Sequence, residues 1–173
     1  MKAWIKGVLC FSVLASAVFT RAHGVTEDMA HAAQNFLSAL PGEKRAKATF
    51  DFKNEERQNW HFIPRERKGL SIKEMSGSER ALALALLNSG MSHRGFFKAV
   101  TIMSLEQILR DVEQGRGPDR DPEQYFVSIF GKPDSHGVWA WRVEGHHLSL
   151  NFTVSGHEVS ATPSFMGTNP GEV

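Results

Sequence analysis

The stretch that decides the fold is WAWRVEGHHLSLNFT, residues 139–153. Apolar and polar side chains alternate on both sides of Glu144-Gly145, a pattern typical of two β-strands that each bury one face. If these two residues form a hairpin loop, Trp141 pairs with Leu148 and Arg142 pairs with His147. Directly paired residues share a face, so one face is predicted to be core and the other polar. The predicted core face carries Trp139, Trp141, Leu148, Leu150 and Phe152, and the predicted polar face carries Arg142, His147, Ser149, Asn151 and Thr153.

Strands are also expected on both sides of this hairpin. Residues 125–130 form an apolar run that Gly131 and Pro133 end, and residues 157–165 alternate after the turn signal Ser155-Gly156. The C-terminal half therefore predicts an antiparallel β-meander, with strands at 138–144, 146–154 and 157–165.

Helices are expected in the N-terminal half. Ser76 and Glu79 form a capping-box pattern before an apolar run that ends at Gly90, and Ser92 is placed to cap the next helix. The sequence thus predicts an α+β fold, in which an N-terminal helical layer (25–114) packs on the C-terminal sheet (124–166). Length favours one such domain over residues 23–173.

The N-terminus has the features of an export signal. Lys2 and Lys6 form a basic segment, an apolar run extends over residues 8–19, and small residues around Ala22 offer cleavage sites. We therefore expect residues 1–22 to be a signal peptide, and the protein to act in the bacterial periplasm or outside the cell. The apolar run is too short to cross a bilayer, so no stable membrane anchor is expected after cleavage.

Charge and cysteine content exclude several classes of protein. Removal of Lys2, Lys6 and Arg21 leaves 17 basic against 19 acidic residues, a net charge of −2 without a basic patch for nucleic acid. The single cysteine, Cys10, lies inside the predicted signal, so the remainder has no disulfide, thiolate metal site or cysteine nucleophile.

The polar face of the hairpin is the best candidate for chemistry. Arg142 would offer a bidentate fork to an anion, Glu144 and His147 would act as acid–base groups, and Ser149 and Asn151 would bind a ligand by hydrogen bonds. These residues predict a small-molecule or anionic ligand. A structural cross-strand cluster is the alternative.

A divalent metal is a weaker prediction, with His146 and His147 as its ligands. Adjacent residues on a strand point to opposite faces, so the two imidazoles cannot share an ion unless a bulge at the turn re-aims one of them.

Four stretches together resemble one bacterial family, the domain of unknown function numbered 3500. They are Ser78-Glu79-Arg80, FGKP at 130–133, WAWRVEGHHLSLN at 139–151 and TPSFMGTNP at 162–170. The resemblance covers most of the chain after residue 22 and implies an exported protein, but it implies no mechanism. Family members usually continue past the last of these stretches, which implies that this chain, ending at Val173, is a shortened form.

Two functions stay open at this point. One is an exported hydrolase-like enzyme, or a metal- or small-ligand-binding protein, with its site around Arg142, Glu144, His146, His147 and Asn151. The other is a non-catalytic envelope protein in which the same cluster is structural. Neither the reaction type nor the oligomeric state follows from the sequence.

Overall fold

A computed structural model describes residues 24–168 of the chain. The predicted signal peptide lies outside these residues. Among residues 24–168, no helix is long and apolar enough to cross a membrane.

Helices fill the first half of the described chain and strands the second. The helices are α1 (Val25–Ala39), α2 (Gly42–Ala48), α3 (Gly77–Ser89) and α4 (His93–Glu113), with two short 3₁₀ turns, η1 (Glu55–Gln58) and η2 (Ile72–Glu74). The longer strands are β3 (Phe126–Phe130), β4 (Val138–Gly145) and β5 (Leu148–Ser155), and the shorter ones are β1 (Thr49–Phe50), β2 (Leu70–Ser71), β6 (Glu158–Ser160) and β7 (Ser164–Met166). The predicted α+β class is therefore confirmed, and so are the capping box of Ser76 with Glu79 and the cap at Ser92.

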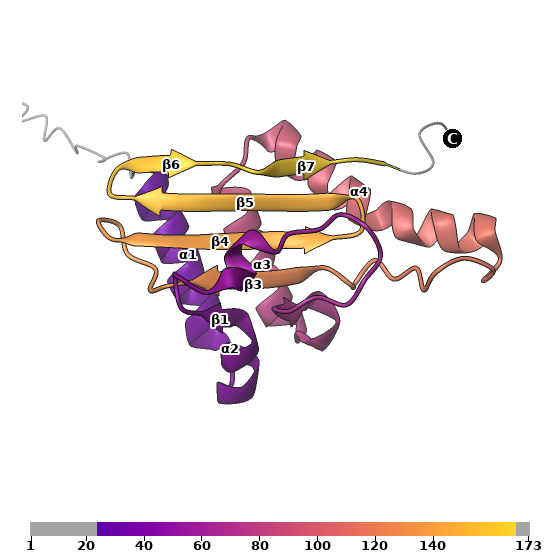
Figure 1. The fold of residues 1–173 in the computed structure, drawn as a ribbon, viewed down its shortest axis with the longest axis horizontal. Helices are drawn as coiled ribbons and strands as arrows, with labels where there is room; N and C mark the ends of the chain where they lie inside the picture. The colour runs from indigo at the N-terminus through magenta and orange to yellow at the C-terminus, as the bar shows by residue number, and fades with distance from the viewer. Residues whose placement is uncertain (1–23, 169–173) are drawn as a thin grey trace, which may run out of the picture.

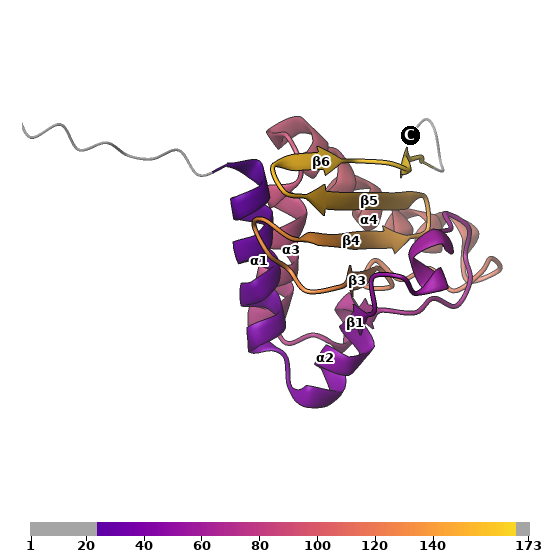
Figure 2. The same ribbon diagram turned by 60° about the vertical axis from the view of Figure 1, so that its left-hand side comes forward.

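The strands form one sheet in the order β1-β3-β4-β5-β6. All pairs are antiparallel except β1 with β3, and the third predicted strand is divided into β6 and β7, which both pair with β5. Figures 1 and 2 show α1, α3 and α4 on one side of the sheet, and the segment 51–69 crossing its other side. The sheet is thus the middle of three layers.

The helix-facing side of the sheet is the hydrophobic core. Trp139, Trp141, Leu148, Leu150 and Phe152 are all buried there, with exposed fractions of 0–4%. They pack on apolar residues of α1 and α3, including Phe36 and Leu86. The predicted core face is correct.

The predicted turn, however, is wrong. Gly145 pairs with Leu148 and Arg142 with Asn151, so the hairpin reverses at His146-His147, two residues later than expected. Gly145 is part of the strand, and the position requires glycine because a Cβ there would stand 2.3 Å from the ring of Tyr125. His147 adopts the positive φ of the turn (58°). The shift changes every predicted cross-strand pair, but it leaves each side chain of β4 and β5 on its predicted face.

Candidate functional site

The sheet face that was expected to be polar is itself covered, by the segment 51–69. Arg142 is 1% exposed on this face. Its Nη1 donates to the backbone oxygen of Glu56 at 2.8 Å, and its Nη2 contacts the carboxylates of Glu56 at 2.7 Å and Glu144 at 3.0 Å. The predicted anion fork is therefore occupied by two acids of the protein itself.

Glu144 holds the same segment at a second point. Its Oε2 accepts from the backbone N–H of His61 at 3.0 Å, and its Oε1 lies 4.0 Å from Nε of Arg67. Burial raises the pKa of Glu144, although the guanidinium of Arg142 opposes this shift. Burial and the neighbouring Arg65, Arg67 and Arg142 lower the pKa of His61. These groups line a charged pocket of about 260 Å³, made by Glu56, Asn59, His61, Arg65, Glu66, Arg67, Lys68 and Glu144.

His146 and His147 lie at the end of the hairpin, away from Arg142. Nδ1 of His146 contacts Oε1 of Glu106, a buried acid on α4, at 2.5 Å. Arg120 approaches the same imidazole at 3.1 Å while both its Nε and Nη2 bind Glu113. Since Arg142 pairs with Asn151 and not with His147, the predicted Arg142–His147 pair does not form.

The two imidazoles of the turn do not point to opposite faces, because neither residue lies on a strand. Their rings lie in contact, with centroids 3.9 Å apart and planes tilted by 41°. Burial, followed by the neighbouring His146, lowers the pKa of His147. Within residues 24–168, no group of three or more His, Cys, Asp or Glu side chains is arranged to hold a metal ion. Among the described residues, the turn therefore offers a divalent cation fewer than three protein ligands in a common arrangement.

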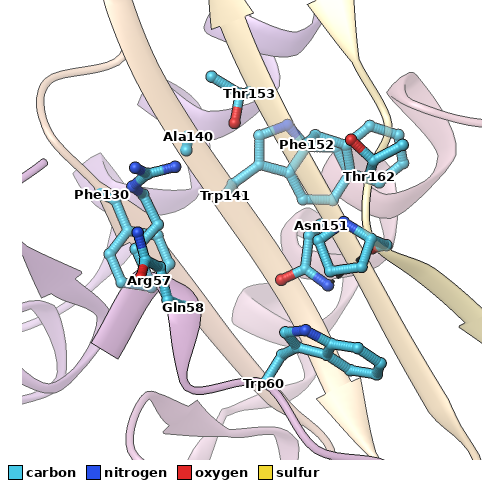
Figure 3. Close-up of a pocket in the computed structure, with 11 residues that line it drawn as sticks. Arg57, Gln58, Trp60, Phe130, Ala140, Trp141, Asn151, Phe152, Thr153 and Thr162 are labelled. Carbon is cyan, nitrogen blue, oxygen red and sulfur yellow. Dashed lines mark hydrogen bonds between the residues drawn. The ribbon is translucent and has the colours of Figure 1, made fainter. Parts of the chain in front are cut away.

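A groove opens on the loop-covered face, beside the charged pocket (Figure 3). Its volume is about 170 Å³. It is lined by Arg57, Gln58, Trp60, Phe130, Ala140, Trp141, Asn151, Phe152, Thr153, Thr162 and Pro163. The segment 58–61 separates the two hollows, since Gln58 and Trp60 line the groove whereas Asn59 and His61 line the charged pocket.

Asn151 is the predicted ligand-binding residue that the groove contains. Its Nδ2 donates to the backbone oxygen of Pro163 at 2.9 Å and to Oγ of Ser149 at 3.1 Å. The Pro163 oxygen can only accept, so the orientation of the amide is fixed. Both N–H groups of Asn151 are thus engaged, and its Oδ1 has no hydrogen-bond partner within residues 24–168. Figure 3 shows this oxygen on the side of Gln58 and Phe130.

Arg57 and Trp60 form the part of the groove that the covering segment contributes. Nε of Arg57 donates to the backbone oxygen of Phe52 at 3.2 Å, and its guanidinium lies over the Phe52 ring at 4.7 Å. Trp60 is half-buried and borders the groove opposite Thr153 in Figure 3. Neither residue was predicted from the sequence. Their only sequence signal is that a basic and an aromatic residue lie close together beside the run 59–63, where the backbone is irregular.

The predicted site residues therefore occupy three places. Arg142 and Glu144 hold the covering segment, His146 and His147 form the turn beside Glu106, and Asn151 lines the groove with Ser149 behind it. A family model described as protein of unknown function (DUF3500) matches residues 22–173. The chain belongs to this family. The resemblance seen in the four sequence stretches is thus confirmed, and the hairpin, the groove and the Glu106–His146 pair all lie in the part that the family model covers. No curated protein and no solved structure matches the chain.

Proposed function

We propose that the chain is an exported protein that binds a small organic molecule in the groove. The observation that carries this proposal is Oδ1 of Asn151. It is an acceptor without a partner among the described residues, fixed in orientation by two donated hydrogen bonds, at the wall of a hollow that also offers aromatic surface. Such a combination of apolar walls and a few placed polar groups is typical of small-molecule sites.

Binding is favoured over hydrolysis by the chemistry of the lining. Arg57 is the only ionisable side chain among the described lining residues, which therefore include no general acid or base. Of the three expected catalytic residues, His147 lies at the hairpin turn outside this lining, whereas Arg142 and Glu144 form an ion pair and hydrogen-bond to the covering segment. Their geometry supports a structural role, which is the role that the alternative interpretation gave to the whole cluster.

Export is proposed on the sequence alone, from the basic and apolar segments before Ala22. Cell fractionation with a C-terminal tag tests it. We expect the protein outside the cytoplasm, with an N-terminus beyond residue 15, and an unprocessed cytoplasmic chain would contradict export.

Ligand binding is tested by thermal unfolding of the purified protein with a panel of small acids, sugars, amino acids and nucleosides. A ligand at 100 times its Kd stabilises the protein by about 2.7 kcal/mol, which raises Tm by about 5–10 °C in a chain of this size. Thr153→Phe fills the groove and should abolish the shift. Thr101→Phe, on the exposed side of α4, should keep it. A panel that shifts neither the wild type nor the Thr101 variant, or one that shifts the Thr153 variant equally, would contradict the proposal.

A further inference from the structure

We propose that the ligand of the groove is a sugar acid, a hydroxylated ring that carries one carboxylate, such as a hexuronate. This inference rests on the proposed function and specifies its ligand. Charge, hydrogen-bond polarity and shape of the lining support it separately.

The charge of the groove favours a monoanion. Arg57 is held by the Phe52 oxygen and ring, and its Nη1 and Nη2 have no hydrogen bond to any residue in 24–168. Two parallel guanidinium N–H groups match the two oxygens of a carboxylate. A phosphate dianion would favour a second cation, and none is found among the described lining residues. No carboxylate is among them either, so the ammonium group of an amino acid would have no counter-ion in the groove.

The polarity of Asn151 requires a donor on the ligand. Because both N–H groups of the amide are engaged, only Oδ1 is left, and it must receive an N–H or O–H. The Thr153 hydroxyl lies on the same wall and can donate or accept. A hydroxyl group satisfies both without adding positive charge. A carboxylate without hydroxyls, by contrast, would leave Oδ1 desolvated and unpaired, which weakens its binding.

The apolar surface of the groove suits one ring. Trp60 and Phe130 provide aromatic surface on two sides, and Ala140 lies on the strand that forms the floor. A volume of about 170 Å³ is small beside the roughly 300–1,000 Å³ of typical small-molecule pockets, so the groove suits a single ring better than a chain of several.

Isothermal titration calorimetry tests the inference with D-glucuronate, its neutral methyl ester, cyclohexanecarboxylate and phenylalanine. We expect glucuronate to bind at least ten-fold more tightly than each of the other three. Arg57→Gln should weaken glucuronate at least ten-fold and leave the methyl ester within two-fold, and Asn151→Leu should weaken both. Arg116→Gln, an exposed arginine outside the groove, is the matched control and should change neither.

A comparison of galacturonate with its trimer shows whether the sugar acid is bound as a free monosaccharide or as the end of a polyuronate chain. Tighter binding of the trimer identifies the end of a polyuronate chain, and equal binding identifies the free monosaccharide; both results support a sugar acid. Equal affinity for glucuronate and its ester, tightest binding of phenylalanine, or an equal loss in the Arg57 and Arg116 variants would overturn the inference. If another member of the thermal panel still bound in a Thr153-dependent manner, the groove would remain a ligand site with a different ligand. If nothing in the panel bound, both proposals would fail.

Discussion

Arg142→Met tests whether buried charges hold the segment 51–69 on the sheet. The substitution keeps much of the side-chain volume but removes the positive charge from between two carboxylates, Glu56 and Glu144, which are 5% and 1% exposed. Their Oε1 atoms lie 2.7 and 3.0 Å from the same nitrogen of Arg142, so they are at most 5.7 Å apart. Without the guanidinium, two buried negative charges would face each other.

The magnitude follows from that distance. Two like charges 5.7 Å apart repel by about 3 kcal/mol at an effective dielectric constant of 20. Removal of one partner of a buried ion pair typically costs 3–5 kcal/mol. We therefore expect Arg142→Met to lower the free energy of unfolding by about 3–5 kcal/mol, a large part of the 5–15 kcal/mol of a typical domain. The triple variant Arg142→Met/Glu56→Gln/Glu144→Gln should recover about half of this loss, because it removes both facing carboxylates. The recovery is partial since Arg67, 4.0 Å from Glu144, loses its own partner.

Urea unfolding at pH 7, followed by circular dichroism, measures both variants. The linear dependence on denaturant gives the free energy, and an unchanged m value shows that the native state is intact. Arg116→Met is the control at an exposed arginine and should lie within about 0.5 kcal/mol of the wild type. A loss below about 1 kcal/mol in Arg142→Met, or a triple variant no more stable than the single one, would refute the role given to the buried charges.

Three further predictions concern single positions. Gly90→Ala should lower the free energy of unfolding by about 1–3 kcal/mol, because the new Cβ would meet the Trp141 ring at 2.7 Å. Gly77→Ala is the control, since its Cβ would meet nothing within 4 Å and should not destabilise the protein. Thermal unfolding compares the two variants. Glu144→Gln should gain stability relative to the wild type as pH rises. Burial raises the pKa of Glu144 above its ordinary 4.5, so the stability that its neutral form contributes is present below pH 4.5 and is lost as pH rises through the raised value. Urea unfolding of both proteins from pH 4 to 8 measures this difference. A wild type that gains stability relative to Glu144→Gln as pH rises would contradict the prediction. His147→Val should cost about 1–3 kcal/mol more than His147→Asn, since a β-branched residue tolerates φ 58° poorly; equal stabilities would contradict this.

The sequence determined the core more clearly than the site. The alternation around Trp141 and Leu150 has a period of two, and an error of two residues in the turn keeps that period, so the predicted core face is correct despite the wrong turn. The turn itself was mispredicted because Gly145 resembles a turn residue. Its real constraint is the Tyr125 ring, which lies 20 positions earlier in the chain, just before β3, and cannot be inferred from the local sequence pattern.

The site was less predictable for the same physical reason. Arg142 and Glu144 stand on an alternating strand, where a polar face normally meets solvent. Only the tertiary structure shows that a segment some 80 residues earlier covers them and supplies Glu56 as a partner. Asn151, predicted from the sequence as a ligand-binding residue, lines the groove. Arg57 and Trp60 were not predicted, because at Trp60 the backbone is irregular and Arg57 lies in a short 3₁₀ turn, so their side-chain directions follow no regular period.

The segment 58–61 separates the two hollows and contributes side chains to both. Its even-numbered side chains, Gln58 and Trp60, contact one hollow, and its odd-numbered ones, Asn59 and His61, contact the other. Natural variation or engineering can therefore alter recognition in the groove through the first pair, while the ion pairs of Glu56 with Arg142 and of Arg67 with Glu144 keep the segment 51–69 attached to the sheet. Relatives that differ only at the positions of Gln58 and Trp60 would be expected to share this architecture and to bind different ligands.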